Sequence, residues 1–361
     1  MEVEHPFTVA ILASYFILIL ALLWRVKDQL KKAYANCNPE IVLFILLSLV
    51  SLLSTWTYMF KFFTHSYREW KQTVGFTAPL SINSMSYWLK DVSLFDSAWR
   101  QVCVGVWQWL WSHQICTLTV SVWTPILAIE GTRRRVPYIW AYMLIGQVVA
   151  ISFASSLFFA VLLAYVPISN KEPSPRLLKT LTLTSIGGII TVVLSPFVAN
   201  TDAFMVNLLV MHILLIFPLV YVESSSTLSS KSASTYAIIL YALAAGANLS
   251  IYANQWFACL DTLTPFDEHT WYAIYDTAIT TFFSHPAQSS VSYDIVCMQF
   301  ISVAWMYTAS KRDYQNVPSW VWILIATTPL LSASVTLPLF FAGYEYDRST
   351  QTITTNTKKI N

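Results

Sequence analysis

Charge is what this sequence has least of. Only 11% of its 361 residues are Asp, Glu, Lys or Arg, 56% are hydrophobic, and the formal net charge is +2. Its cations form short clusters and no basic stripe, which argues against a nucleic-acid-binding protein. The mean hydropathy is +0.54. This composition predicts an integral membrane protein.

Cysteine is also sparse. The five cysteines are scattered and include no CxxC pair, so neither a disulfide framework nor a zinc site is indicated. The sequence likewise has no haem-ligating cysteine motif, no GxGxxG and no nucleophile elbow. The cysteines are Cys37, Cys103, Cys116, Cys259 and Cys297.

Long apolar runs predict the fold. A helix needs roughly 20 apolar residues to cross about 30 Å of hydrocarbon, and the chain offers eight or nine such windows. We expect an all-α, polytopic transmembrane helical bundle, with residues 1–361 forming one membrane domain. The N-terminus opens with two glutamates rather than a basic segment, which favours a retained first span over a cleaved signal peptide. The expected spans are 7–24, 41–60, 107–129, 137–165, 180–199, 203–222, 234–256, 294–310 and 318–342.

Two long connections interrupt the spans, at 64–106 and 257–293, and both are expected to hold interfacial or re-entrant structure. The first contains an amphipathic helix, which has two interpretations. It is an interfacial helix with solvated carboxylates, or it covers a membrane cavity with Asp91, more than Asp96, facing the apolar layer. One face of this helix carries Trp88, Val92, Phe95, Trp99, Val102 and Val106.

The cationic loops predict an orientation. "WRVKDQLKK" follows the first span and "EGTRRRVP" follows the third, so this side is expected to be cytoplasmic and the N-terminus lumenal. Nine simple crossings, however, place Lys311 and Arg312 in the lumen, so one assignment must be wrong. An extra crossing or re-entrant helix in "HTWYAIYDTAITTFFSH" repairs the count and places Asp276 at membrane depth.

Two spans carry polar stripes. Such stripes form hydrogen bonds between helices, worth about 1 kcal/mol each, or they line a cavity for a molecule with polar and apolar parts. Both interpretations remain open from the sequence. The stripe in 107–129 contains His113, Thr117 and Thr124, and the stripe in 234–256 contains Tyr241, Asn248, Tyr252 and Gln255.

Carboxylates within the spans are the strongest functional candidates, because each costs about 2.5–3.5 kcal/mol at the membrane centre. Asp294 is expected to open the span 294–310. A favourable helix dipole is one explanation for it, and a cavity-facing acid is the other. Glu130 and Asp202 abut loops, where a solvated helix end is the alternative. The cavity-facing interpretation of Asp294 rests on the stripe that continues from it through Met298, Ile301 and Trp305.

Several spaced blocks resemble a known family. "WLKDVSLFDSAWRQV", "WQWLWSHQICTLTVSVW", "EGTRRRVPYIWAYMLIGQVVAISFASSLFF" and "SSVSYDIVCMQFISVAW" are similar to segments of the fungal membrane-bound terpene cyclases of the ascochlorin and ascofuranone type. The resemblance runs from about residue 85 to 310. It implies an endoplasmic reticulum enzyme of meroterpenoid biosynthesis that cyclises the terminal epoxide of a farnesylated aromatic polyketide. The acids in the matching blocks are Asp91, Asp96, Glu130 and Asp294.

Epoxide opening requires a neutral acid, and an apolar site raises the pKa of a carboxyl group in that direction. We expect Asp294 first, then Asp91, as this acid, with Glu130 as a further catalytic candidate. Aromatic faces then stabilise the isoprenoid cation. Substrate contacts are expected from His113, Tyr241, Asn248, Tyr252, Trp88 and Trp305.

Other classes remain as alternatives. No DDxxD or NDxxD spacing is present, so ionisation of a diphosphate by bound magnesium is not expected, and neither a metal nor a cofactor is predicted. The expected partners are the membrane and an epoxidised prenylated aromatic drawn from it. A transporter or channel for a small lipophilic molecule predicts inverted repeats and broken helices, and neither is apparent in the sequence. A non-catalytic membrane scaffold is the third possibility.

Overall fold

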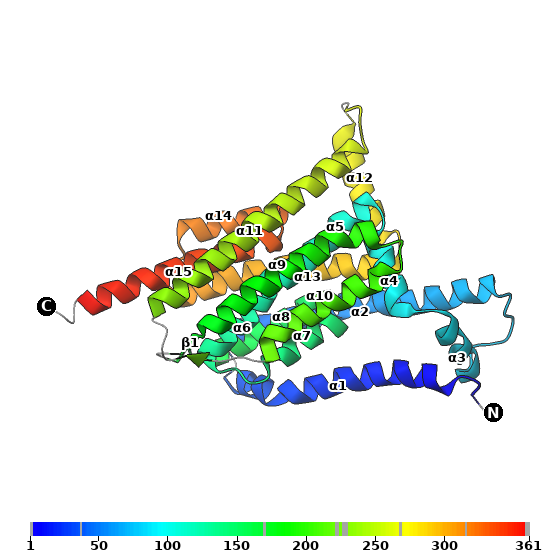
Figure 1. Ribbon diagram of the computed structural model, residues 1–361, viewed down its shortest axis with the longest axis horizontal. Coiled ribbons are helices and arrows are strands. Elements are labelled where there is room, and N and C mark those ends of the chain that lie inside the picture. The colour runs from blue at the N-terminus through cyan, green and yellow to red at the C-terminus, as the bar shows by residue number, and fades with distance from the viewer. Residues whose placement is uncertain are drawn as a thin grey trace.

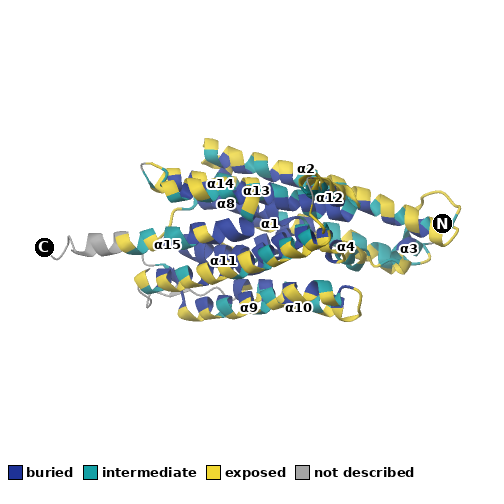
Figure 2. Ribbon diagram, turned by 90° about the horizontal axis from the view of Figure 1, so that it is seen from above, coloured by how far each residue is buried: buried dark blue, intermediate teal, exposed yellow. Residues whose placement is uncertain are grey.

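The chain folds as a bundle of helices, and the expected all-α class is confirmed (Figure 1). The computed structural model describes residues 3–36, 38–168, 171–220, 224–225, 230–266, 269–314 and 316–357. Six of the described helices are long and apolar enough to cross a membrane. Their outer faces carry exposed apolar side chains, as a protein surrounded by lipid requires (Figure 2).

The elements follow one another with short connections. They are α1 (Pro6–Ala35), α2 (Pro39–Thr73), α3 (Ile82–Asp91), α4 (Leu94–Cys103), α5 (Val106–Leu118), η1 (Thr119–Trp123), α6 (Thr124–Arg134), α7 (Ile139–Val148), α8 (Ile151–Ala164), β1 (Glu172–Pro173), α9 (Pro175–Val198), α10 (Ala203–Val220), β2 (Ser224–Ser225), α11 (Ser230–Asp261), α12 (Thr270–Phe283), α13 (Pro286–Asp313), α14 (Ser319–Leu331) and α15 (Ala333–Thr357). The two short strands pair antiparallel.

The central helix is the continuous rod α5–η1–α6, whose most apolar stretch is wholly buried. The π-helical turn η1 immediately precedes Pro125, which has no N–H to give to the carbonyl four residues earlier. A wider turn accommodates this missing hydrogen bond without ending the helix. Helices α9, α10, α11, α13 and α15 pack against this rod.

The bundle has one strongly cationic end, here called the basic end. The last turn of α6 lies there with the end of α8, since Ile168 N–H donates to the Arg133 carbonyl at 3.0 Å. The end of α13 joins them through Arg312, whose Nη1 lies 3.1 Å from the Leu163 carbonyl. The end of α1 does so through Lys32, which lies over the Tyr165 ring. The opposite end carries α3, α4 and α12 (Figure 1).

The expected single span 137–165 is wrong, because the chain forms two half-length helices there. Helix α7 ends at Val148, Ala150 is extended (φ −171°, ψ 142°), and α8 then begins. The two helices pack on each other, and α8 ends at the basic end, where α7 starts. We call this pair the first hairpin, and Val149–Ser152 its tip. It enters the bundle and returns without crossing.

The expected span 318–342 is wrong in the same way. It divides into α14 and α15 at Ser332, which has a φ of 71°, and we call this pair the second hairpin. Because neither hairpin crosses, Lys311 and Arg312 lie at the basic end beside Arg133. The helix α12 is not the extra crossing that could repair the count. It has 14 residues and carries the 81% exposed Trp271.

The order of elements recurs along the chain. Residues 39–164 contain α2, α3, α4, α5–η1–α6, α7 and α8, and residues 230–357 contain α11, α12, α13, α14 and α15, so that of these described helices α3 alone has no counterpart. The packing corresponds as well: α2 contacts α8 and α13, while α11 contacts α15 and α5. Likewise α4 packs on α5 and α12 on α13. The structure therefore contains a tandem arrangement that the sequence did not reveal.

The expected amphipathic helix is two helices, α3 and α4, joined at two extended residues. Val92 is extended (φ −117°, ψ 121°) and Ser93 stands at the N-cap position of α4. The break means that Trp88 and Trp99 no longer share one stripe. Helix α3 packs on α1 and α2, and α4 packs on α5 and α13.

Candidate functional site

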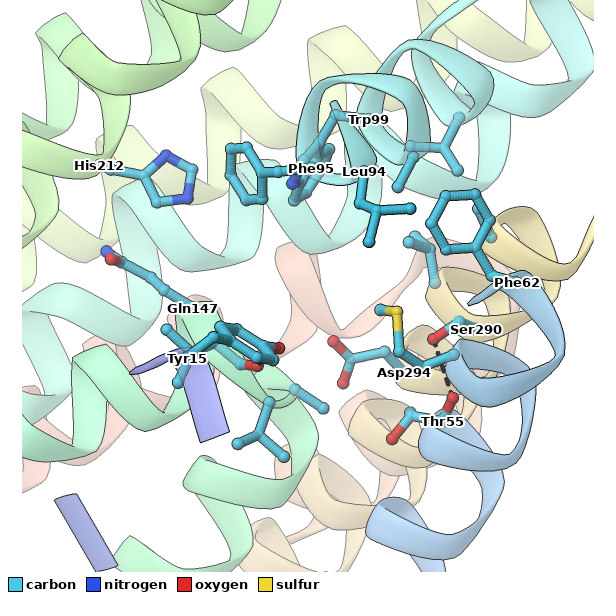
Figure 3. A pocket seen from close by; sticks show the side chains of 18 of the residues that line it. Tyr15, Thr55, Phe62, Leu94, Phe95, Trp99, Gln147, His212, Ser290 and Asp294 are labelled. Carbon is cyan, nitrogen blue, oxygen red and sulfur yellow. Dashed lines mark hydrogen bonds between the residues drawn. The ribbon is translucent and has the colours of Figure 1, made fainter. Parts of the chain in front are cut away.

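A cavity with a volume of about 630 Å³ lies at the tip of the first hairpin. Helices α1, α2, α3, α4, α5, α10 and α13 complete its walls. Most of its lining is apolar, with aromatic side chains that include Tyr15, Phe62, Phe95 and Trp99 (Figure 3). A cavity of this size and character is typical of a small-molecule site, and we call it the main cavity.

Asp294 is the one acidic side chain that lines the main cavity among the described residues. It is the ninth residue of α13, which begins at Pro286 after the N-cap His285 and not at 294 as expected. At 1.5 Å per residue, Asp294 lies about 12 Å along the axis from the start of the helix. Its residue exposure is 9%, and its carboxyl group faces Tyr15 across the cavity (Figure 3).

The carboxyl group of Asp294 caps the first hairpin. Oδ1 accepts the N–H of Ser152 at 2.8 Å and also its hydroxyl, while Oδ2 accepts the N–H of Ile151 at 3.1 Å. These are the first N–H groups of α8, which lack partners within their own helix. Asp294 thus has a helix-dipole partner, but the helix is α8 and not its own α13.

The two oxygens of Asp294 differ in what they can still do. Oδ1 already accepts two hydrogen bonds and Oδ2 accepts one, so Oδ2 retains the capacity to carry a proton toward the cavity. Asp294 forms no ion pair within the described part of the chain. Burial disfavours the charged form of the carboxyl group, whereas the N–H groups stabilise the carboxylate that forms after proton release.

Hydroxyl groups near Asp294 form hydrogen bonds that join α2 to α8 and to α13. The Ser152 hydroxyl also contacts the Ser51 hydroxyl of α2, and both residues are fully buried. One turn along α2, the Thr55 carbonyl accepts the Ser290 hydroxyl at 3.0 Å (Figure 3). Since α2 and α13 both hold the tip through these bonds, Asp294 has a fixed position relative to the cavity wall.

Further polar side chains line the main cavity, among them Lys90 from the end of α3, and the sequence interpretation missed three of them, Tyr15, Gln147 and His212. Tyr15 donates its hydroxyl to the Val148 carbonyl at the end of α7. Gln147 Nε2 is buried without a hydrogen-bond partner in the described structure. His212 lies on α10 beside Phe95, with ring centroids 5.9 Å apart. A lone glutamine and a lone histidine within apolar runs were the available signal.

Asp91 does not reach the main cavity. It is solvent-exposed, and its Oδ2 accepts the Trp70 Nε1–H at 2.9 Å. Trp88 is buried and donates its Nε1–H to Ser66 at 3.2 Å. Asp96 binds Arg100 at 2.7 Å, a hydrogen bond that raises the pKa of Arg100. Asp91, Trp88, Asp96 and Arg100 all lie on α3 and α4, at the end of the bundle opposite the basic end.

Arg100 fixes the cover of the main cavity. Its Nη1 donates to the Thr201 carbonyl at 3.1 Å and to the carbonyl of Ala199, which ties α4 to the turn between α9 and α10. From α4, Leu94, Phe95 and Trp99 line the cavity. Helix α4 therefore covers one side of the cavity, without Asp91.

Glu130 lies in a buried ion cluster at the basic end, not at a solvated helix end. Its oxygens bind Arg133 at 3.1 Å and also Arg134. Together with Trp305 it lines a second, smaller cavity of about 200 Å³. The Trp305 ring stacks on Phe159 with centroids 4.2 Å apart. Glu130 and Trp305 are thus separated from Asp294 and belong to the packing of the basic end.

The polar stripes of the sequence meet at the second hairpin. Asn248 donates to the Ser334 carbonyl at 2.7 Å, and Tyr252 donates to the Leu330 carbonyl at 2.7 Å. The His113 ring lies 5.9 Å from that of Tyr252. Tyr241 stacks on Phe341 with its hydroxyl buried and unpartnered among described groups.

None of these four stripe residues lines either cavity. The hydrogen bonds of Asn248 and Tyr252 join helices, as the structural interpretation of such stripes expects. Of the nine residues predicted for the site, the main cavity therefore contains Asp294 alone. The other expected contacts belong to the second hairpin, the basic end or α3.

The described part of the chain holds no group of three His, Cys, Asp or Glu side chains placed to bind a metal. Cys103, Cys116, Cys259 and Cys297 are buried and free. Cys37 lies outside the described residues.

Comparison with known proteins adds one finding. A family model described as "Protein of unknown function DUF2834" matches residues 254–345, which include α12, α13 and α14 and therefore Asp294. No curated protein and no solved structure matches the chain significantly. The match covers part of the second half of the tandem arrangement.

Proposed function

We propose that this protein is a membrane-bound terpene cyclase of meroterpenoid biosynthesis. It protonates the terminal epoxide of a farnesylated aromatic polyketide and cyclises the isoprenoid chain. The observation that carries the proposal is the single buried carboxyl group of Asp294 in a large apolar cavity. The sequence blocks that resemble such cyclases include Asp294 and also supply α4, α5 and the first hairpin.

The acid step uses Asp294 and the tip of the first hairpin. Oδ2 of Asp294 gives its proton to the epoxide oxygen, the adjacent carbon–oxygen bond breaks, and the oxygen becomes a hydroxyl group. The N–H groups of Ile151 and Ser152 already point at the carboxyl group, at 3.1 and 2.8 Å. They stabilise the carboxylate as it forms without reorganising, which is how preorganised donors lower a barrier.

The apolar wall suits the cation that follows. Tyr15, Phe62, Phe95 and Trp99 present aromatic rings to the cavity, and ring faces attract a cation without bonding to it. Water capture is the competing reaction of such a cation, and an apolar lining limits it. The volume of about 630 Å³ lies within the usual range of pockets that bind drug-sized molecules, roughly 300–1,000 Å³.

We assign the basic end to the cytoplasm and the N-terminus to the lumen of the endoplasmic reticulum. The support is the clustering of Arg133, Arg312 and Lys32 at one end of the bundle, since cationic loops stay cytoplasmic. The main cavity then opens nearer the lumenal side, under α4. A lipophilic substrate reaches it from the bilayer.

A transporter for a small lipophilic molecule is the second candidate. Its support is that the first and second hairpins each form where one span was expected, and that they occupy corresponding places in the tandem arrangement. Half-length helices that meet inside a bundle are typical of transporter binding sites. The first hairpin and Asp294 then form a binding site instead of a reaction site. The two functions differ in whether a new carbon–carbon or carbon–oxygen bond appears.

The test is turnover of a farnesylated phenol with a terminal epoxide by the purified protein in lipid nanodiscs. A product of unchanged mass and altered ring structure supports the cyclase. Asp294→Asn keeps the size and an acceptor oxygen but has no acidic proton, so turnover is expected to fall about 100-fold or more. Asp91→Asn is the matched control, because Asp91 lies in a resembling block but is exposed, and it should retain wild-type turnover.

Two results contradict the cyclase. One is normal turnover by a folded Asp294→Asn protein, which removes Asp294 from the acid role. The other is an unchanged epoxide together with vectorial uptake of the compound into proteoliposomes, which supports the transporter.

A further inference from the structure

His212 is the one imidazole that lines the main cavity among the described residues. Its Nδ1 lies 2.7 Å from the carbonyl oxygen of Leu208, one turn earlier on α10. A carbonyl oxygen only accepts hydrogen bonds, so Nδ1 carries the hydrogen and Nε2 of the neutral ring has a free lone pair. Nε2 has no hydrogen-bond partner in the part of the chain that the structure describes. His212 therefore offers a base to the cavity.

The position of His212 separates this base from the acid. It extends from α10 beside Phe95, whereas Asp294 extends from α13 on the other side of the cavity (Figure 3). The side chains of Tyr15 and Gln147 lie between them along the wall (Figure 3). A bound chain that touches both groups must extend across the cavity.

The proposed reaction needs a base in such a place. Protonation opens the epoxide at one end of the isoprenoid chain, and each double bond that attacks moves the positive charge further along it. The charge therefore arises away from Asp294, and the carboxylate that has just lost its proton is badly placed to end the reaction. A neutral imidazole with a free lone pair is suited to accept a proton at that point.

We propose that Nε2 of His212 accepts the proton whose loss ends the cyclisation. This inference rests on the proposed cyclase function. The balance is complete: Asp294 gives one proton to the epoxide oxygen, and His212 takes one from the carbon next to the final cation, whose C–H electron pair becomes the new double bond. The product is an isomer of the substrate. The proton then returns from His212 to Asp294 through water that enters the emptied cavity.

The test compares product mixtures from the same epoxy-farnesyl phenol. His212→Asn lacks the Nε2 lone pair, so the cation persists and is captured by water or loses a different proton. The ratio of these altered products to the wild-type product should rise about tenfold or more, because positioned bases contribute roughly 10²–10⁴-fold. Epoxide consumption should fall less, since the acid step is intact.

His113→Asn is the matched control. The His113 Nδ1 has the same 2.7 Å contact with a carbonyl four residues earlier, and its side chain is buried, but it lies outside the cavity lining. Its product mixture should match that of the wild type. His212→Gln gives a second variant without a basic ring if the asparagine variant folds poorly.

The outcomes distinguish a failure of the role of His212 from a failure of the proposed cyclase function. If the wild-type protein converts the epoxide and both His212 variants give the wild-type mixture at the wild-type rate, the role of His212 is overturned. If the wild-type protein leaves the epoxide intact, the cyclase function itself fails. An altered mixture from His113→Asn as well means that any buried histidine matters, which also overturns the assignment.

Discussion

The ion cluster at the basic end should be a main source of stability. Arg133 binds Glu130 at 3.1 Å, Glu172 at 3.0 Å and Glu345 at 3.0 Å, and Arg133 itself is only 1% exposed. Replacing Arg133 with Met keeps most of the side-chain volume but leaves buried carboxylates without their shared cation. Removing one partner of a buried ion pair costs about 3–5 kcal/mol, and here three carboxylates lose the same partner.

The measurement is reversible unfolding of the purified protein in mixed micelles, followed by circular dichroism. Arg133→Met should lose at least about 3 kcal/mol of unfolding free energy. Combining it with Glu345→Gln should restore part of this loss, because one unpaired charge is removed. Arg135→Met is the control, since Arg135 is exposed. A loss under about 1 kcal/mol, as for a surface pair, or no restoration in the double variant, would refute this account.

Two smaller changes test the tip of the first hairpin and the start of α13. Ser152→Ala removes one hydrogen bond from Asp294 and should slow turnover about tenfold, because hydrogen bonds to charged groups are worth about 1.5–3 kcal/mol. Ser156→Ala is the control, because Ser156 is equally buried on α8, and it should leave turnover unchanged. Equal effects of the two substitutions would refute the role of Ser152 in supporting Asp294. Burial lowers the pKa of His285, whose Nδ1 accepts the Ala287 N–H at 3.2 Å. The unfolded chain therefore takes up the proton first as the pH falls through about 6.5, so acid should reduce the unfolding free energy, and His285→Asn, a cap that does not titrate, should lessen that reduction.

The crossing helices could be predicted from the sequence because length and hydropathy determine them. The broken helices could not. No glycine or proline stands at Val149 and Ala150, and the partner that satisfies the new helix end, Asp294, lies more than 140 residues further on. A break that depends on a distant carboxylate leaves no local signal, so 137–165 has the appearance of one long span.

The sequence predicts that Asp294 is a buried acid, and it is buried, but it lies in the third turn of α13 and not at the start of a helix. The residues before it are expected to belong to the connection 257–293, although Pro286 is an ordinary signal of a helix start. Asp91 was misplaced because a single helix was assumed across Val92. His212 was available as a lone histidine in an apolar helix, but its relation to Asp294 exists only after α10 and α13 pack around the same cavity.

The two hairpins of the tandem arrangement differ in what occupies the space next to them. At the second hairpin, Asn248 and Tyr252 occupy the space with their own hydrogen bonds, and Gln114 is the ninth residue of α5, as Asp294 is of α13. The tip of the first hairpin thus meets an acid and a cavity, whereas the tip of the second hairpin is filled. Because Asp294 comes from α13 and the hairpin that it caps comes from residues 39–164, each half of the tandem arrangement supplies what the other lacks, and neither half forms the main cavity alone.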